Sequence, residues 1–403
     1  MTSLSLIIPN YNNADYLDEC MESVLNQVRI PDEVVIIDDA STDHSVEKIK
    51  MYEQKYPFVR GIYNDRNRGV AYSRHYAIVQ SKGEYITMLD SDDFFSDPHK
   101  LKNEMELIEK WKKEHNEDII AFSNFALYNP KSGECAPVYL HNYEVPSGGI
   151  FFEVITRSKP IPRDFVMKRE CYFDVGGFDT TLAIYEDWDL NIRLASKYKF
   201  YYTQGMGTAY RVHGSGLSAA DYLTHILTIR DVFRKYEHLF ADAGEKKRAA
   251  KKITNYLIRM FLNRCGLNDR ERSVLTGLLR DAGLLPLRRA RRIENKLRSL
   301  KNNGTVLIYG AGQHTEMLLS LFDFRDISVA GIVDQNVKLH ASTLMGYSIY
   351  PPQMIRELRP DAVIVSSHKH QSQIVRYLKD ELKYKGTIVR LYRTNDDQPF
   401  YVV

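Results

Sequence analysis

The sequence has little of what defines several protein classes. Among 403 residues there are only four cysteines, and no two form a Cys-x-x-Cys pair. We therefore expect neither a disulfide scaffold nor a cysteine metal knuckle, and the chain suits a reducing compartment. No apolar run approaches the roughly 18–20 residues of a membrane span. The opening residues, "SLSLIIPNYN", lack the order of a signal peptide, so we expect a soluble, cytoplasmic chain.

An excess of one charge is also missing, because the net charge is only +3. We find no internal repeat and no low-complexity segment. The composition, 44% hydrophobic and 27% charged, is typical of a globular protein with a real core. The length exceeds that of one common domain, so we expect more than one.

Short apolar runs alternate with helix-like segments in the first hundred residues. The runs cover 4–12, 33–41 and 84–93, and one of the helices is expected at about 70–81. We expect Ser41 or Thr42 to cap the helix that follows them. Such alternation predicts an α/β fold with a mostly parallel sheet covered on both faces. We predict three parts: an α/β domain at 1–220, a basic helical region at 221–302, and a smaller Rossmann-like α/β domain at 303–403.

Carboxylates follow the apolar runs where the predicted strands end. The stretch "YITMLDSDDFF" places three of them within four residues; the set is Asp38, Asp39, Asp90, Asp92 and Asp93. Ligands of parallel sheets bind at the carboxyl ends of the strands. Crowded carboxylates repel, and oxygen ligands suit hard ions such as Mg²⁺ or Mn²⁺. Solvated turn residues are the alternative, since Asp is common in turns.

Seven segments occur in one order along the first half of the chain: "PNYNNADYLDECMESVLNQ", "VVIIDDASTD", "NRGVAYSRHYAI", "GEYITMLDSDDFF", "VGGFD", "YEDWDLNIRLA" and "YRVHGSGLS". Together they resemble the nucleotide-sugar-binding GT-A fold of family 2 glycosyltransferases, over about residues 3–218. The resemblance implies an inverting, metal-dependent transfer of a sugar from a nucleoside-diphosphate donor, with a UDP-sugar favoured, to a hydroxyl acceptor. It also implies bacterial surface or extracellular glycan assembly.

The resemblance implies roles for individual residues. The nucleotide-sugar donor would be bound by Pro9, Tyr11, Asp39, Arg68, Asp90, Gly177 and Glu186. Asp92 and His213 would contact Mn²⁺ or Mg²⁺, and Asp93 would orient the acidic loop. Asp187 would be the base that removes the acceptor proton, with Asp189 as the alternative base. Acidic residues also favour helix starts without any catalytic role, so the simpler interpretation of Asp187 stays open.

The region 245–303 is strongly basic, with 17 Lys and Arg against 5 Asp and Glu. A solvated helical surface is one interpretation; contact with an anionic membrane surface is the other. The resemblance implies a glycan or lipid-linked acceptor, and a peripheral position at the inner face of the membrane would suit it. We expect no nucleic-acid partner, because no recognition motif accompanies the charge. An oligomer is possible.

The segment "VLIYGAGQHTEMLL" resembles a Rossmann-like phosphate loop. Gly310 and Gly312 stand between a strand and a helix, and Asp334 ends the next strand, but Thr315 replaces the third glycine. The ligand of this domain therefore stays open. Two alternative functions also stay open, namely a catalytically silent nucleotide-sugar-binding scaffold and NAD-linked chemistry in the C-terminal domain.

Overall fold

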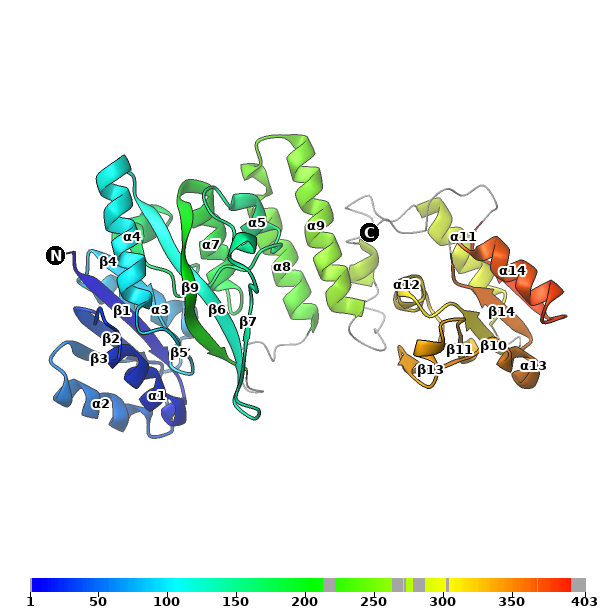
Figure 1. Ribbon diagram of the computed structural model, residues 1–403, viewed down its shortest axis with the longest axis horizontal. Coiled ribbons are helices and arrows are strands. Elements are labelled where there is room, and N and C mark those ends of the chain that lie inside the picture. The colour runs from blue at the N-terminus through cyan, green and yellow to red at the C-terminus, as the bar shows by residue number, and fades with distance from the viewer. Residues whose placement is uncertain are drawn as a thin grey trace. The chain divides into compact units, whose positions relative to one another are not determined.

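The computed structural model describes residues 2–212, 222–262, 271, 273–277, 287–301, 304–367 and 369–392. The chain forms two compact units, Met1–Asp242 and Ala243–Val403 (Figure 1). Among the described residues, no helix is both long enough and apolar enough to cross a membrane.

The first unit contains two sheets and the helices around them. Its strands are β1 (Leu4–Asn10), β2 (Glu33–Asp38), β3 (Val59–Tyr63), β4 (Tyr85–Met88), β5 (Phe94–Phe95), β6 (Ile119–Asn129), β7 (Glu134–Pro137), β8 (Met167–Lys168) and β9 (Lys199–Arg211). Its helices are α1 (Ala14–Leu25), α2 (Ser45–Lys55), α3 (Val70–Gln80), α4 (Lys100–His115), α5 (Phe151–Ile155), α6 (Arg169–Asp174), α7 (Glu186–Lys197) and α8 (Tyr222–Tyr236), with 3₁₀ turns η1 (Asn142–Glu144) and η3 (Glu237–Leu239).

The larger sheet has the strand order β3-β2-β1-β4-β8, and all neighbours are parallel except β4 and β8. The central strand β1 is buried along its whole length, because successive side chains enter opposite faces that are both covered. On one face Leu4, Leu6 and Ile8 pack into a core with residues of α1, α2 and α4. Helix α3 packs against β1 and β2. The mostly parallel sheet predicted from the apolar runs is confirmed.

The second sheet of this unit has the order β5-β9-β6-β7. Strands β6 and β9 run side by side and parallel over most of their length (Figure 1). Strand β5 pairs with β9 directly after the acidic loop, so Phe94 lies opposite Ala209. The pairing places the end of β9 next to the three clustered aspartates.

Helix α8 is part of the first unit, whose boundary therefore lies beyond residue 220. The Tyr185 hydroxyl lies 3.0 Å from Nδ1 of His225, and Lys235 and Tyr236 contact Asp189 of α7. The basic region 221–302 is thus shared between the two compact units. The three-part division of the chain remains a prediction about domains.

The second unit is a smaller α/β unit. Its strands are β10 (Thr305–Tyr309), β11 (Ser328–Val333), β12 (Thr343–Leu344), β13 (Tyr347–Tyr350), β14 (Ala362–Val365) and β15 (Thr387–Arg390). Its helices are α9 (Ala243–Leu262), α11 (Leu287–Arg298), α12 (Gln313–Leu321), α13 (Met354–Leu358) and α14 (Gln371–Asp380), with the 3₁₀ turn η4 (Val337–Leu339). The sheet order is β12-β13-β11-β10-β14-β15, with only β12 and β13 antiparallel.

Candidate active site

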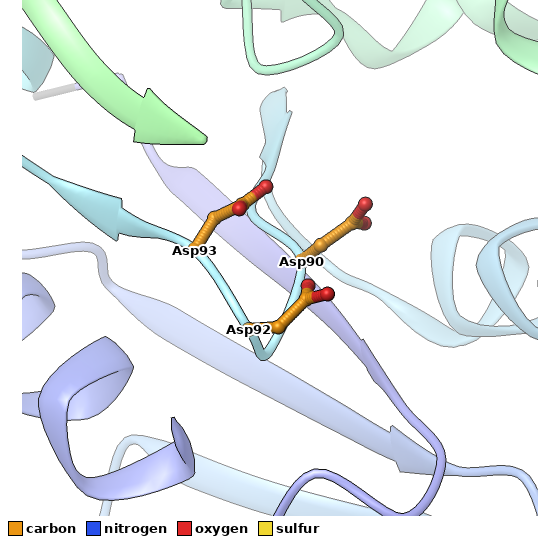
Figure 2. Close-up of side chains that lie close together, drawn as sticks. All are labelled: Asp90, Asp92 and Asp93. Atoms are coloured by element: carbon orange, nitrogen blue, oxygen red, sulfur yellow. The ribbon is translucent and has the colours of Figure 1, made fainter. Parts of the chain in front are cut away.

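Three aspartates gather just beyond the carboxyl end of β4. Asp90, Asp92 and Asp93 each offer a carboxylate oxygen within 4.8 Å of those of the other two. Figure 2 shows the three side chains extending from the turn between β4 and β5 in the same general direction. The donors are all oxygen, which is the set that a hard divalent cation prefers. The cluster predicted from "DSDD" therefore forms, and its residues fit Mg²⁺ or Mn²⁺.

Two arginines neutralise part of this cluster. Arg74 of α3 donates to Asp90 Oδ1 over 2.6 Å, and the Nε of Arg163 lies 2.7 Å from Asp90 Oδ2. Arg163 also donates through Nη2 to Asp93. Both oxygens of Asp90 are thus in contact with a guanidinium. The net negative charge of the site is therefore smaller than the three aspartates of the loop alone would give.

Arg74 also ties the acidic loop to the start of α7. Its Nη1 donates to Glu186 Oε1 over 2.6 Å, and both side chains are about 5% exposed. The resulting chain of alternating charges runs Asp93, Arg163, Asp90, Arg74, Glu186. It brings together four elements that are far apart in the sequence. Asp90 and Glu186, both predicted as donor-binding residues, are therefore linked through one arginine.

Burial and charge act in opposite directions on these acids. Burial opposes ionisation of Asp90, but Arg163 and Arg74 outweigh it and lower its pKa below the usual range. Burial raises the pKa of Asp93 to about 7, against the lowering effect of Arg163. Burial likewise raises the pKa of Glu186 to about 7, although Arg74 opposes the rise. The site therefore contains acids with very different affinities for a proton.

Asp187 follows Glu186 in the first turn of α7 and is half-buried. Its Oδ1 accepts the backbone N–H of Trp188 over 2.7 Å. Burial lowers the pKa of Arg163, but Asp90, Asp93 and also Asp187 raise it, and the net result lies well above the usual value. Asp187 is thus close enough to act electrostatically on the arginine of the cluster.

The contacts of Asp189, the alternative base, are those of a residue that stabilises the fold. It is fully buried, and Arg193 donates to it over 2.6 Å. Lys235 and Tyr236 of α8 also donate to it, over 2.9 and 2.8 Å. These contacts join α7 to α8 and use both carboxylate oxygens. Asp189 is therefore engaged in contacts within the fold on both of its oxygens.

A second set of contacts holds the acidic loop from the side of β9. The Arg211 backbone N–H donates to Asp93 Oδ1 over 2.8 Å, and its Nε donates to the Asp92 carbonyl over 2.8 Å. The Arg211 guanidinium also pairs with Glu19 and lies 4.8 Å from the Tyr16 ring centroid. Through Asp93 and the Asp92 carbonyl, Arg211 thus fastens the acidic loop to the end of β9.

Asp39, which follows β2, is buried and accepts hydrogen bonds that hold a neighbouring loop in place. Its Oδ1 accepts from Asn64 Nδ2 over 2.7 Å and from the Arg68 N–H over 2.8 Å, while Oδ2 accepts from the Gly69 N–H over 2.8 Å. The Arg68 side chain turns to Asp65, at 2.8 Å. Asp39 and the Arg68 backbone are therefore neighbours.

The remaining predicted donor residues occupy different environments. Pro9 is buried within β1, whereas Tyr11 beyond it is 46% exposed and presents its ring to solvent. Gly177 has φ +66°, and a Cβ there would lie 2.8 Å from the buried Tyr172 ring, so the position requires glycine. His213 lies outside the described residues.

A buried ionic network lies behind the site and fixes the segment that carries Arg163. Lys100 donates to Glu104 Oε2 over 2.8 Å and lies 3.1 Å from Asp164 Oδ2. Ser123 donates to Glu104 Oε1 over 2.7 Å. One ammonium serves two buried carboxylates here, and burial raises the pKa of Glu104 to about 7, against the lowering effect of Lys100.

The sequence did not predict the two arginines that complete the arrangement, Arg163 and Arg211. Arg163 lies in a stretch without periodicity, 70 residues from its partner Asp93, so no spacing indicates the contact. Arg211 lies in "YRVHGSGLS", one of the seven segments that carry the family resemblance. That segment indicates that Arg211 is near the site, but it does not indicate which residue Arg211 contacts. From the sequence, Arg74 on the helix expected at about 70–81 could equally be a site residue or a helix-face charge; in the structure its side chain is 5% exposed and pairs with Asp90.

The loop of the second unit that resembles a phosphate-binding loop is held in place by hydrogen bonds within its own unit. Asp334 accepts the Ala311 N–H through Oδ2 over 2.7 Å and the Asn336 N–H through Oδ1 over 2.8 Å. Thr315, at the position of the third glycine, is fully buried and donates to Ser366 Oγ over 2.8 Å. The acidic residue and the threonine thus hold the loop against neighbouring strands.

Comparison with known proteins agrees with the geometry. Residues 5–185 match the family described as Glycosyl transferase family 2, and residues 302–388 match the family described as C2185-like, N-terminal. S. aureus TarS 1–349 in complex with UDP-GlcNAc superposes with a TM-score of 0.50 at 18% identity, covering 70% of this chain and 80% of that one. The first unit has the GT-A fold.

Two curated relatives are glycosyltransferases. Glycosyltransferase GlyG of Streptococcus pneumoniae serotype 4 is 32% identical over 130 residues, which are 32% of this chain and 41% of that protein. The putative teichuronic acid biosynthesis glycosyltransferase TuaG of Bacillus subtilis is 33% identical over 119 residues, 30% of this chain and 41% of that protein. The chain thus spans less than half the length of these relatives. Residues 5–185 thus resemble glycosyl transferase family 2, both in the family match and in these relatives.

Proposed function

We propose that the protein is an inverting glycosyltransferase that moves a sugar from a nucleoside-diphosphate donor to a hydroxyl acceptor. The observation that carries the proposal is the charge chain from Asp93 to Glu186, because it joins the acidic loop to the helix start that bears Asp187. A donor-binding region and a base are thereby held at one site. The match of residues 5–185 to glycosyl transferase family 2 supports the same reaction class.

A UDP-sugar is the favoured donor. Support comes from the fold shared with S. aureus TarS, whose structures include complexes with UDP and with UDP-GlcNAc. In the proposed arrangement the base of the nucleotide lies against the exposed ring of Tyr11 and beside Pro9 and Asp39. Arg68 lies near the diphosphate and Asp90 holds the ribose, while Gly177 and Glu186 border the sugar.

Catalysis is proposed to require Mn²⁺ or Mg²⁺. Asp92 would be the main ligand, with Asp90 and Asp93 within 4.8 Å, and His213 is the further ligand implied by the motif. When bound, the metal supplies charge neutralisation for the departing diphosphate. Arg74 and Arg163 favour the ionised form of Asp90 and orient its carboxylate.

Asp187 is proposed to take the proton of the acceptor hydroxyl as that oxygen attacks the sugar carbon. Glu186 is not the proposed base, because its carboxylate forms an ion pair with Arg74. Direct attack on the face opposite the leaving group inverts the configuration at that carbon. One base is enough for such a single displacement, since no covalent intermediate must be resolved.

The acceptor is proposed to be a glycan or a lipid-linked glycan of the bacterial surface. The name of TuaG, which refers to teichuronic acid biosynthesis, supports this context. The basic region 245–303 would hold the enzyme at the anionic inner face of the membrane, in the cytoplasm. The predicted domain division, 1–220, 221–302 and 303–403, would then assign chemistry to the first part and membrane contact to the second.

The first experiment follows release of nucleoside diphosphate from a panel of UDP-, dTDP- and GDP-sugars with Mn²⁺, Mg²⁺ or EDTA. Metal-dependent release from one donor, lost in Asp92→Ala, supports the transferase and identifies the sugar. Without release from any donor, UDP binding by the wild type would favour a silent scaffold. Lack of UDP binding together with binding of NAD would instead favour chemistry in the C-terminal domain.

The role of Asp187 is tested by Asp187→Asn, once a donor and an acceptor are known. We expect transfer to fall by about 10²–10⁴-fold, the usual contribution of a general base, while UDP binding is retained. Asp15→Asn is the matched control, because Asp15 is an exposed acid in the first turn of α1. Equal losses in both variants would mean that Asp187 only complements the helix dipole.

A further inference from the structure

The Arg163 side chain places a positive charge inside the acidic cluster. Its Nη2 donates to Asp93 Oδ2, and its Nε lies 2.7 Å from Asp90 Oδ2. Asp93 is 2% exposed and the Arg163 side chain is 24% exposed. The guanidinium therefore contacts two of the three carboxylates whose oxygens lie within 4.8 Å of one another.

The position of Arg163 is fixed by its surroundings. The guanidinium carbon lies 4.3 Å from the Tyr210 ring centroid, and the Arg163 N–H donates to the Tyr210 hydroxyl over 3.0 Å. The next residue, Asp164, accepts from Tyr210 and Thr208 and lies 3.1 Å from buried Lys100. The backbone contact fixes where this side chain starts, and a guanidinium that left the cluster would lose its contact with the Tyr210 ring.

A divalent cation and this guanidinium would share the same carboxylates. At about 5 Å, a single and a double positive charge repel strongly enough, even with water-like screening, to change a binding constant by on the order of tenfold. A nucleoside diphosphate carries the negative charge that offsets this repulsion. Metal binding should therefore depend strongly on the presence of the nucleotide.

We propose that Arg163 is a positioning residue that keeps the affinity of the acidic cluster for a divalent metal low until the nucleoside diphosphate binds. The inference rests on the proposed function, since it assumes a metal at Asp92. It goes beyond that function by assigning the coupling between metal and nucleotide to one side chain. Mn²⁺ alone should bind weakly, and Mn²⁺ with UDP should bind tightly. Because binding free energies are linked, Mn²⁺ should tighten UDP by the same factor.

The test is a Mn²⁺ titration of the full chain, with free Mn²⁺ measured by electron paramagnetic resonance, with and without UDP. Arg163→Gln should bind Mn²⁺ alone at least about tenfold more tightly than the wild type does. The factor by which UDP tightens Mn²⁺ binding should shrink correspondingly. Arg163→Lys keeps the charge and should stay close to the wild type.

Arg193→Gln is the matched control, because Arg193 forms an equally shielded pair with Asp189, at 2.6 Å, and contacts none of the three clustered carboxylates. Its Mn²⁺ affinity should not change. Should Arg163→Gln fail to fold, Arg163→Met answers the same question, since an unbranched apolar side chain can still pack on Tyr210.

The outcomes separate the inference from the function on which it rests. Unchanged or weaker Mn²⁺ binding by a folded Arg163→Gln or Arg163→Met, together with wild-type binding of Mn²⁺ and UDP, overturns the inference alone. Absence of Mn²⁺ binding by the wild type even with UDP overturns the proposed metal dependence, and the inference with it.

Discussion

Arg74 is the residue whose loss should disturb the first unit most clearly. Its side chain is 5% exposed, and it forms ion pairs of 2.6 Å with Asp90 and with Glu186. In Arg74→Gln, Asp90 keeps Arg163, whereas Glu186 loses the ion pair that offsets its burial. Removing one partner of a buried ion pair typically costs about 3–5 kcal/mol, because the remaining carboxylate must either stay charged without its partner or take up a proton. We expect the free energy of unfolding to fall by an amount in this range.

The assay can be confined to the first unit. Both tryptophans of the chain, Trp111 and Trp188, lie in it, so urea denaturation followed by tryptophan fluorescence reports on this unit alone. Lys102→Gln is the control, since the Lys102–Glu106 pair is exposed and 3.8 Å long. Loss of such a surface pair should cost less than about 1 kcal/mol.

A double variant tests the cause of the loss. Adding Glu186→Gln to Arg74→Gln removes the carboxylate that lacks its partner, so part of the stability should return. The interaction energy from the double-mutant cycle should lie between about 0.5 and 3 kcal/mol. If Arg74→Gln costs no more than the Lys102→Gln control, or if the two changes are simply additive, the charge chain does not stabilise the site as argued.

Two further predictions concern stability. Glu104 shares the Lys100 ammonium with a second buried carboxylate and has its pKa raised to about 7, so its stabilising contribution is complete below about pH 4.5 and is lost as the pH rises through 7. Between pH 5 and 8 the unfolding free energy of the wild type should therefore fall more steeply than that of Glu104→Gln, by up to about 1.4 kcal/mol per pH unit, and parallel slopes would contradict the assignment. Gly177→Ala should destabilise the first unit more than Gly133→Ala does, because both have positive φ but only Gly177 lies against a buried ring, Tyr172. Fluorescence-monitored denaturation compares the two, and equal losses would mean that the ring moves away freely.

The alternation of apolar runs and helical segments was sufficient to predict the larger sheet. Buried parallel strands read as continuous apolar runs, and helix α3, expected at about 70–81, spans Val70–Gln80. The predicted helix cap was wrong, because α2 begins at Ser45. The Ser41 hydroxyl instead accepts the Asn12 N–H over 2.9 Å, so the chain makes one more turn before the helix starts.

The candidate site was predictable only where its residues follow strand ends or helix starts. Asp90, Asp92 and Asp187 stand at such positions, and a local pattern marks them. Arg163 reaches the cluster from a stretch with no period, and its place is set by the packing of Tyr210 and Asp164. Contacts of this kind depend on the folded chain, because no spacing in the sequence relates the two partners.

The three hydrogen bonds that Asp39 accepts have a consequence for ligand affinity. The loop containing Asn64, Arg68 and Gly69 is fastened to the end of β2 by folding itself. The conformational entropy of this loop is therefore lost when the protein folds, before any nucleotide binds. A ligand that docks there loses little of its binding free energy to loop ordering, so even a small set of contacts can hold it.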